Sequence, residues 1–424
     1  MKVYSTVTGL VVSTLSAKRD VGSHTNAITS VVLNPHNAFQ LITGSLDGHI
    51  KVWDLLDGVL LQTIGVGNPV RHIAAHKRWK DFLFVAIARP SKKRKANGTS
   101  VVVPSFCLPP PNAIGRFILL FYTGDDDNCV VLRVSLKPSP ATLQQQPVQT
   151  SSESTLVGKT RTTRGLAVSA SGSWLVAIGG HKAYVASTAN LKSGFVKFVS
   201  PEALTCLAFH PTEEYFATGD DKGHIRLWYC LHETIATTAT TTAAAAVAAA
   251  AKPQVEKRAP TSTLHWHAHA VSALTFTLNG AYLLSGGEES VLVMWQIHSG
   301  KRELVPRVGA PIDSVVVSRT QGGEEDYLLG LADGSFVFIS SMNLKISRSY
   351  SGIKLGECLF FFLRGFLGAY VYLIHLDCQI PQYQMVDHQH PHQHLWLYTR
   401  SHLHSFSRLL TRPHYKRIHH LHQN

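Results

Sequence analysis

Residues 24–61 read HTNAITSVVLNPHNAFQLITGSLDGHIKVWDLLDGVLL. Three runs rich in β-branched and aliphatic residues are separated by an Asn-Pro turn at 34–35 and a Leu-Asp-Gly turn at 46–48. A fourth run follows the Asp-Gly turn at 57–58. Four short strands joined by tight turns predict one small antiparallel sheet. Such a sheet cannot bury both faces by itself, so it requires neighbours of the same kind.

The neighbours are present in the sequence. Residues 203–229 read ALTCLAFHPTEEYFATGDDKGHIRLWY, with a His-Pro turn for Asn-Pro and GHIRLW for GHIKVW. Residues 264–297 read LHWHAHAVSALTFTLNGAYLLSGGEESVLVMWQI and end their third run on a tryptophan. Weaker copies occur at 165–187 and 311–340, and 68–135 reads as a further copy with a long insertion. The chain is therefore predicted to be an assembly of repeats.

These repeats resemble those of the WD40 family, in which units of about 40–45 residues each form one four-stranded propeller blade. The resemblance implies an all-β WD40 β-propeller of about six to seven blades. The Trp-Asp dipeptide that names the family is intact at Trp53-Asp54. It is altered after Trp228 and Trp295, which Tyr and Gln follow.

The resemblance also implies a hydrogen-bonded set within a blade, made of a His, an Asp, a Ser or Thr, and the Trp. In the first repeat these map to His24, Asp47, Trp53 and either Thr43 or Ser45. A buried indole N–H needs an acceptor, and each such bond contributes about 0.5–1.5 kcal/mol net. We expect these residues to be structural rather than catalytic.

The other two tryptophan repeats carry this set only in part. The repeat at 264–297 has His267 and Trp295, but Glu289 stands at the Asp position. The repeat at 203–229 has Trp228, with Lys222 at that position.

Longer phrases resemble one family among the WD40 proteins. They are KVYSTVTG (2–9), LDGHIKVWDLLDGVLL (46–61), LTCLAFHPTEEYFATG (204–219), LHWH (264–267), LLSGGEESVLVMWQ (283–296) and LVPRVGAPI (304–312). They are similar to the WD repeat-containing protein 75 family, nucleolar propeller proteins whose fungal relatives belong to the transcription-linked part of the small-subunit processome. The resemblance covers residues 1–354.

That resemblance implies a non-catalytic scaffold in ribosome biogenesis, located in the nucleus and nucleolus. Its implied roles are pre-rRNA processing within the small-subunit processome and support of RNA polymerase I transcription. The implied partners are other processome proteins and pre-ribosomal or small nucleolar RNA, contacted mainly through phosphates. The alternative is a WD40 adaptor outside the nucleolus, such as a ubiquitin-ligase substrate receptor or a signalling scaffold.

The predicted propeller spans residues 1–354, and KVYST at its start reads as the third strand of an opening blade that is incomplete. Insertions are predicted at 91–112, at 137–163 and at 233–262, which is rich in Ala and Thr. Residues 355–424 are rich in His, lack the blade pattern and are predicted to lie outside the propeller, as a disordered tail or a gene-model artefact. The apolar run at 358–374 carries Arg364 near its centre, which disfavours a membrane span.

Composition sets broader limits. Of 424 residues, 45% are hydrophobic and 16% are charged, which excludes wholesale disorder. The six scattered cysteines form neither a disulfide framework nor a zinc pattern. The net charge of +13 is compatible with nucleic acid or another acidic partner.

A basic cluster lies in the insertion at 91–112. Lys92, Lys93, Arg94 and Lys95 resemble a monopartite nuclear localisation signal, and the alternative is a solvated basic loop.

Catalytic motifs are absent from the sequence, which has no phosphate loop, no H-E-x-x-H, no G-x-S-x-G and no C-x-x-C. The acidic run Asp125–Asp127 lacks the spacing of a calcium loop and reads as a hairpin turn. Alternate histidines from His388 to His394 could bind zinc or nickel adventitiously. We therefore expect no enzyme activity, no cofactor, no metal site, no small-molecule substrate and no membrane partner.

Overall fold

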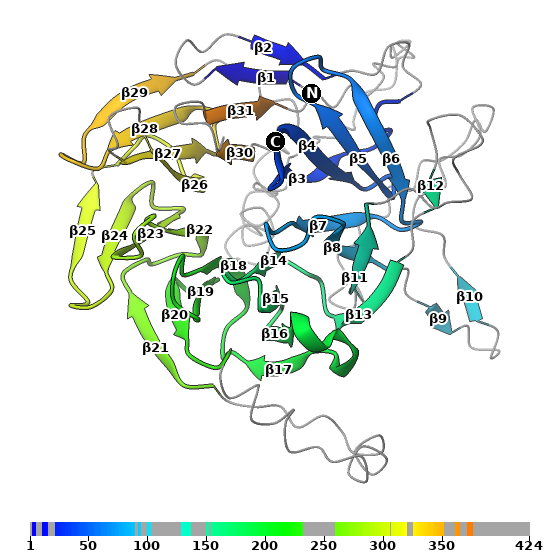
Figure 1. Cartoon of the computed structure of the whole chain (residues 1–424). Coiled ribbons are helices and arrows are strands. Elements are labelled where there is room, and N and C mark those ends of the chain that lie inside the picture. The colour runs from blue at the N-terminus through cyan, green and yellow to red at the C-terminus, as the bar shows by residue number, and fades with distance from the viewer. Residues whose placement is uncertain are drawn as a thin grey trace, which may run out of the picture.

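The computed structural model describes the parts of the chain that form a ring of β-sheets (Figure 1). The described residues are 2–5, 11–15, 22–89, 92–94, 100–102, 129–136, 150–151, 154–231, 259–305, 307–319, 325–351, 361–364 and 371–375. The strands are arranged around a common centre, and their order around the ring follows the chain. The predicted all-β WD40 propeller is thereby confirmed.

Six blades contain four antiparallel strands each, numbered here in chain order. Blade 1 consists of β3 (Ile28–Asn34), β4 (Asn37–Ser45), β5 (His49–Asp54) and β6 (Leu60–Gly65). Blade 2 consists of β7 (Val70–Ala74), β8 (Phe82–Ala88), β11 (Cys129–Ser135) and β13 (Ser154–Thr160). Blade 3 consists of β14 (Gly165–Val168), β15 (Trp174–Gly179), β16 (Lys182–Ser187) and β17 (Val196–Val199).

The remaining three blades follow the same plan. Blade 4 consists of β18 (Leu204–Phe209), β19 (Phe216–Asp220), β20 (His224–Trp228) and β21 (Thr261–His265). Blade 5 consists of β22 (Val271–Phe276), β23 (Tyr282–Gly287), β24 (Leu292–Gln296) and β25 (Arg302–Val305). Blade 6 consists of β26 (Ile312–Arg319), β27 (Glu325–Leu331), β28 (Phe336–Ser340) and β29 (Ile346–Tyr350). The weaker repeats at 165–187 and 311–340 thus form blades 3 and 6.

Two of the predicted insertions are shorter than the sequence indicated. The segment 137–163 contains β13, the outer strand of blade 2, and β12 (Thr150–Ser151), which pairs in parallel with β6. Its Ser and Thr content concealed a strand whose pairing partner, β11, precedes it by a long connection. The insertion predicted at 233–262 ends earlier, because β21 begins at Thr261. The insertion at 91–112 contains a separate hairpin, β9 (Lys92–Arg94) with β10 (Ser100–Val102).

A seventh sheet, here named the closing sheet, joins the two ends of the described chain. Its order is β2 (Val11–Thr14), β1 (Lys2–Ser5), β31 (Val371–His375) and β30 (Phe361–Arg364). The strand β1 occupies the third place from β30, as the KVYST pattern predicted. The first two places are filled from the segment that the sequence placed outside the propeller. Hairpin formation between β30 and β31 explains this difference, because an apolar run can supply strands without any blade motif.

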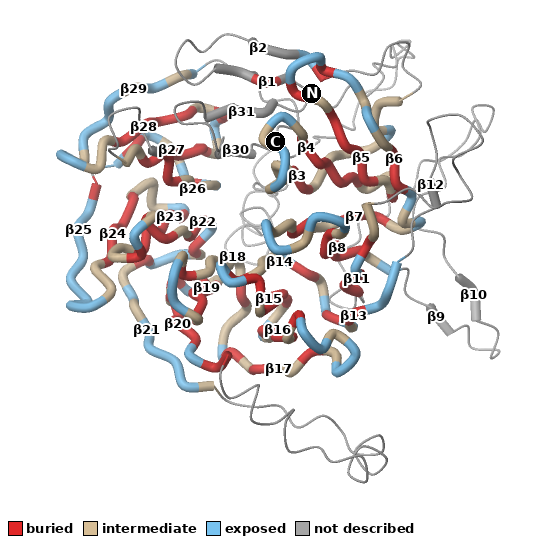
Figure 2. Tube along the Cα trace, in the orientation of Figure 1, coloured by how far each residue is buried: buried red, intermediate tan, exposed pale blue. Residues whose placement is uncertain are grey.

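The hydrophobic core consists of seams between neighbouring sheets. Along each central strand, alternate side chains point to opposite faces. In β8, Leu83, Val85 and Ile87 pack toward blade 1, whereas Phe84 and Ala86 pack toward blade 3. Figure 2 shows the result, with buried central strands such as β15 and β19 and exposed outer strands such as β21, β25 and β29. Each blade therefore depends on both of its neighbours for burial.

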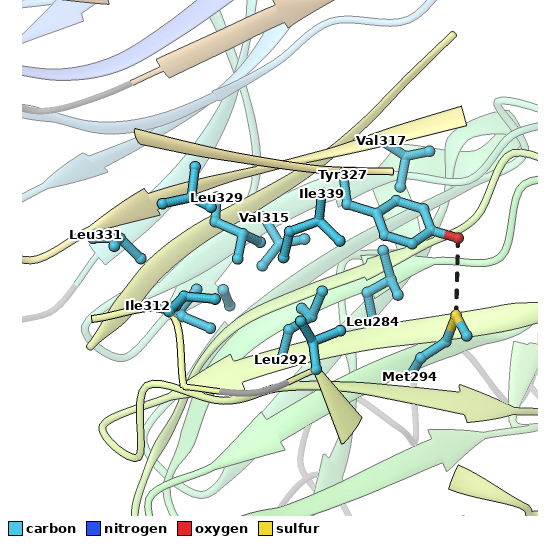
Figure 3. Packing of buried hydrophobic residues seen from close by; sticks show 14 residues of the cluster. Leu284, Leu292, Met294, Ile312, Val315, Val317, Tyr327, Leu329, Leu331 and Ile339 are labelled. Atoms are coloured by element: carbon cyan, nitrogen blue, oxygen red, sulfur yellow. Dashed lines mark hydrogen bonds between the residues drawn. The ribbon is translucent and has the colours of Figure 1, made fainter. Parts of the chain in front are cut away.

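The seam between blades 5 and 6 illustrates this packing (Figure 3). Leu284, Leu292 and Met294 of blade 5 lie against Ile312, Val315, Tyr327, Leu329 and Ile339 of blade 6. The Tyr327 hydroxyl donates to the Met294 sulfur at 3.8 Å, so the buried phenol has a partner within the seam. Burial raises the pKa of Tyr327 to about 12, so the phenol stays neutral at physiological pH.

The first strand of a blade, which lies nearest the centre of the ring, is here called its inner strand. A β-bulge recurs in these inner strands. Five of them carry one extra residue at the same register position, a β-bulge. The extra residues are Thr29, Arg71, Thr205, Ser272 and Asp313. Three of them donate a side-chain hydroxyl to the carbonyl that begins the next inner strand: Thr29 to Val70 (2.7 Å), Thr205 to Val271 (2.5 Å) and Ser272 to Ile312.

The closing sheet can be tested by truncation. We expect removal of residues 355–424 to lower the melting temperature by at least about 5 °C, because β1 loses its partner β31 and becomes an exposed edge. Removal of residues 376–424 alone is the matched control, since it keeps β30 and β31. Equal melting temperatures for the two truncated proteins would show that this pairing does not support the ring.

Candidate functional site

Three tryptophans occupy equivalent places in three blades. Trp53, Trp228 and Trp295 lie in the third strands of blades 1, 4 and 5, and each is at most 2% exposed. Each indole N–H donates to a hydroxyl ten residues earlier, on the second strand. The acceptors are Thr43 for Trp53 (2.9 Å), Thr218 for Trp228 (2.8 Å) and Ser285 for Trp295 (2.9 Å). The common geometry establishes that these blades repeat one structural plan.

In blade 1 the indole bond continues into a chain of four side chains. His24 Nε2 lies 2.8 Å from Thr43 Oγ1, and His24 Nδ1 lies 2.8 Å from Asp47 Oδ2. Since Thr43 Oγ1 already accepts the indole N–H, its own proton can go to His24 Nε2. The imidazole then carries its proton on Nδ1 and donates it to Asp47. The chain links a surface turn to the buried seam.

The sequence left Thr43 and Ser45 as alternatives for the hydroxyl of this set. The structure places Thr43 in the chain. The Ser45 hydroxyl instead donates to the Asn26 carbonyl at 2.9 Å and accepts the Asp47 N–H at 3.2 Å. Both hydroxyls lie near the indole in sequence, and their hydrogen-bond partners in the structure distinguish them.

Blade 5 contains the same chain with a longer acid. His267 Nδ1 lies 3.1 Å from Glu289 Oε2, and His267 Nε2 lies 2.9 Å from Ser285 Oγ. The other oxygen of Glu289 accepts the His269 N–H at 2.7 Å. The residue after Glu289 is Ser290, whose φ of 60° lies in the left-handed region where blade 1 has Gly48. Glu289 therefore takes the place that Asp47 has in blade 1.

Blade 4 replaces the His–Asp pair with a different ion pair. Lys222 stands at the Asp position, and Asp220 accepts its backbone N–H at 3.0 Å and that of His224 at 2.9 Å. Arg226 donates to Asp220 Oδ2 at 3.2 Å, and Asp220 is 1% exposed. The turn carboxylate has thus moved two residues along the chain. The sequence signal for this carboxylate was the pair of Asp residues before Lys222, and the role of Asp220 was not predicted from it.

Burial and charge fix the protonation of these chains. Burial lowers the pKa of His24 and of His267 below the free value of 6.5, against the opposing effect of their carboxylate partners. Burial alone would raise the pKa of Asp47, but hydrogen bonds from His24 and from backbone N–H groups outweigh it and lower the pKa to about 2. Both histidines are therefore neutral and Asp47 is ionised near neutral pH.

The remaining predicted residues lie apart from these chains. Asp54, at the end of β5, accepts the backbone N–H of Leu56 at 2.8 Å and that of Asp57 at 3.3 Å, so it stabilises the following turn. Lys92, Lys93 and Arg94 form β9 of the separate hairpin. Lys95, the acidic run Asp125–Asp127 and the histidines 388–394 lie outside the described residues.

The described residues hold neither a metal-ion cluster nor a membrane-spanning helix. In this part of the chain no group of three or more His, Cys, Asp or Glu side chains is arranged to hold a metal ion. Within the same ranges no helix is both long enough and apolar enough to cross a membrane. The His24 and His267 chains instead link buried strands to turns.

One group of basic and aromatic residues was not predicted from the sequence. The turn between β7 and β8 contains Lys77, Arg78, Trp79 and Lys80, a tryptophan flanked by three cations. The available signal was this interleaving of basic and aromatic residues, a pattern typical of nucleic-acid surfaces.

Two family models match parts of this chain. Residues 1–107 and 252–324 match the model for the first β-propeller of WD repeat-containing protein 75, and residues 196–229 match the WD domain, G-beta repeat. The chain is therefore a WD40 β-propeller protein. The family model and the relatives show that it is similar to WD repeat-containing protein 75.

Three relatives show the extent of the similarity. Human WD repeat-containing protein 75 is 30% identical over 319 residues, which is 75% of this chain and 31% of that protein. The zebrafish protein of the same name is 27% identical over 373 residues, or 86% of this chain and 36% of its own length. The U3 small nucleolar RNA-associated protein 17 of Schizosaccharomyces pombe is 43% identical over 91 residues, 22% of this chain and 11% of that protein. The chain thus matches about a third of the length of the two vertebrate relatives.

Removing one hydroxyl should break the blade 1 chain. We expect Thr43→Val to lower the free energy of unfolding by about 1–3 kcal/mol, because the Trp53 indole N–H and His24 Nε2 both lose their partner in a buried site. In the Thr43→Val background, Trp53→Phe should cost about 1 kcal/mol less than it does in the original protein. Urea denaturation of the four proteins measures the coupling.

The exposed Thr155→Val on β13 is the matched control and should change stability by less than about 0.5 kcal/mol. Additive costs for Thr43→Val and Trp53→Phe would show that the two side chains are not coupled.

The buried histidines predict a loss of stability in acid. The folded protein keeps His24 and His267 neutral where the unfolded chain already binds protons, so the free energy of unfolding falls as the pH drops below about 6.5. The lowered pKa of Asp47 adds a further loss between about pH 4 and pH 2.

Urea midpoints across pH 7.5 to 5 measure the first effect. The double variant His24→Gln/His267→Gln lacks both titrating groups, so its stability should depend less steeply on pH over that range. An unchanged slope in this variant would assign the acid sensitivity to other histidines of the chain.

Proposed function

We propose that this propeller is a non-catalytic scaffold in ribosome biogenesis, acting in the nucleolus as a component of the small-subunit processome. The observation that carries the proposal is the match of residues 1–107 and 252–324 to the first propeller of WD repeat-containing protein 75. A fungal relative is named for association with U3 small nucleolar RNA, and this supports small nucleolar or pre-ribosomal RNA and processome proteins as partners.

The polar chemistry of the blades supports a scaffold rather than an enzyme. Each His–acid–hydroxyl set resembles a hydrolase triad in composition, but its hydroxyl oxygen accepts a buried indole N–H. That hydroxyl is 0% exposed in both Thr43 and Ser285, so it cannot meet a substrate. These sets stabilise the turns that the blades present at the rim, and a rigid rim suits the docking of several partners.

The proposal is tested by tagging the full chain and observing its location and its bound RNA in cells. We expect the protein to coincide with a nucleolar marker and to co-purify U3 RNA and pre-rRNA over a spliceosomal RNA. Added salt should weaken the RNA association, because phosphate contacts release counterions. Diffuse cytosolic protein without these RNAs would support the adaptor alternative.

A variant with Lys92, Lys93, Arg94 and Lys95 changed to Ala tests the import signal in the same cells. We expect this variant to accumulate in the cytoplasm if the cluster directs import. Unchanged nuclear accumulation would assign the cluster to a solvated loop. Support of RNA polymerase I is tested separately, by pulse-labelling new pre-rRNA after depletion of the protein and its restoration.

A further inference from the structure

The turn that follows β7 differs from its counterparts in the other blades. Residues 75–81 contain three cations, a tryptophan and a single carboxylate, Asp81. The corresponding first-to-second-strand turns read SASGS at 169–173, HPTEEY at 210–215 and TLNGA at 277–281. No structural need common to all blades explains the basic and aromatic content of this one turn.

Side chains of this turn and of two strands form a stack, here named the ladder, in which two aromatic rings lie between two cations. The guanidinium of Arg78 lies 5.1 Å from the centre of the Trp79 ring, and that of Arg133 lies 3.7 Å from the centre of the Phe82 ring. The two rings lie 4.9 Å apart and are tilted by 35°. Arg133 comes from β11, so the third strand of the blade completes a surface that the turn begins.

The rings are anchored in the molecule while the cations face solvent. Trp79 and Phe82 are partly buried and pack on the core cluster between blades 2 and 3, and Phe82 contacts the buried Phe84 edge to face. Arg78 and Arg133 are exposed. Stacking on an aromatic face fixes a guanidinium plane and leaves its N–H edges free, which is the arrangement that binds phosphate through two bonds.

Trp79 also differs from the tryptophans of the blade networks. Its indole nitrogen has no hydrogen-bond acceptor among the described residues, whereas Trp53, Trp228 and Trp295 each have one. Its ring therefore does not belong to a blade network, and its described contacts are those of the ladder and the adjoining core.

The turn is held in place before any ligand arrives. His76 Nε2 lies 3.0 Å from the Ala170 carbonyl of blade 3, and the His76 carbonyl accepts the backbone N–H of Trp79 at 3.0 Å. A side chain at Gly172 would collide with His76, at 2.7 Å from its ring, so the glycine permits this close approach. Arg78 also reaches the Ser173 hydroxyl at 3.4 Å. A fixed turn loses little conformational freedom on binding.

We propose that this surface, formed by Lys77, Arg78, Trp79, Lys80, Phe82 and Arg133, binds the backbone of single-stranded RNA. The stacked guanidinium groups receive successive phosphates, the flanking lysines add charge, and unpaired bases stack on the exposed guanidinium planes. The surface carries four cations against one carboxylate, Asp81, which matches a polyanion. The inference deepens the proposed function by giving its RNA partner a place on the ring.

The test measures binding of a fluorescein-labelled single-stranded oligouridine to the full purified chain by fluorescence anisotropy. We expect the double variant Arg78→Ala/Arg133→Ala to bind about tenfold more weakly. The slope of log Kd against log salt should fall by the amount that corresponds to the loss of about two phosphate contacts. The double variant Arg78→Lys/Arg133→Lys keeps the charge but loses the planar fork, so it should still bind several-fold more weakly.

The matched control is Lys301→Ala/Arg302→Ala, which removes two exposed cations beside β25 of blade 5. It should change the affinity by less than about twofold. Equal losses for the control and for the ladder variant would overturn the proposal, because binding would then follow net charge alone. Displacement of the RNA by polyaspartate at equal charge concentration would also overturn it, since the surface would then accept any anion.

Thermal melting of each variant shows whether it remains folded. If the double variant is unstable, the single variant Arg78→Ala replaces it, because it keeps the contact of Arg133 with Phe82. The outcome is separable from the proposed function. If the protein lies in the nucleolus with U3 RNA but the ladder variant binds oligouridine as well as the original protein does, the proposal for this surface is wrong. The proposed scaffold function would be unaffected by that result.

Discussion

Neither face of a central strand in this protein can be left in water without losing a large part of the apolar burial that stabilises the fold. The side chains of β8 show this most clearly, because alternate residues enter two different seams. A blade buried on both faces is stable only between two others, and a row of such blades has exposed ends until it closes. Closure of the ring is therefore a consequence of two-sided burial.

The three indoles contribute to this two-sided burial. Trp53, Trp228 and Trp295 each fill the seam toward the preceding sheet, where a large ring buries more area than an aliphatic side chain. Each brings a polar N–H into that seam, and a hydroxyl on the neighbouring strand accepts it. In blades 1 and 5 the hydroxyl leads on through a neutral histidine to an acid in a turn. In blade 4 an Asp220–Arg226 pair orders the turn instead.

The division between buried networks and exposed turns also explains how one ring can both persist and bind. The polar groups of the His–acid–hydroxyl chains and their indoles are satisfied internally, so they offer little to a ligand. Exposed turns are free to differ, and the turn with Trp79 differs most in charge and aromatic content.

The amino-acid sequence by itself determined most blade strands, the repeat and the places of the indoles, because strand periodicity and turn chemistry act over a few residues. It also placed Lys222 and Glu289 at the positions where the acid of blade 1 stands. The tertiary structure decided what depends on distant residues meeting: Thr43 over Ser45, the pairing of β1 with β31, the strand hidden at Ser154–Thr160, and the approach of Arg133 to Phe82. Such contacts join segments far apart in the chain, and only the closed ring fixes which of them become neighbours.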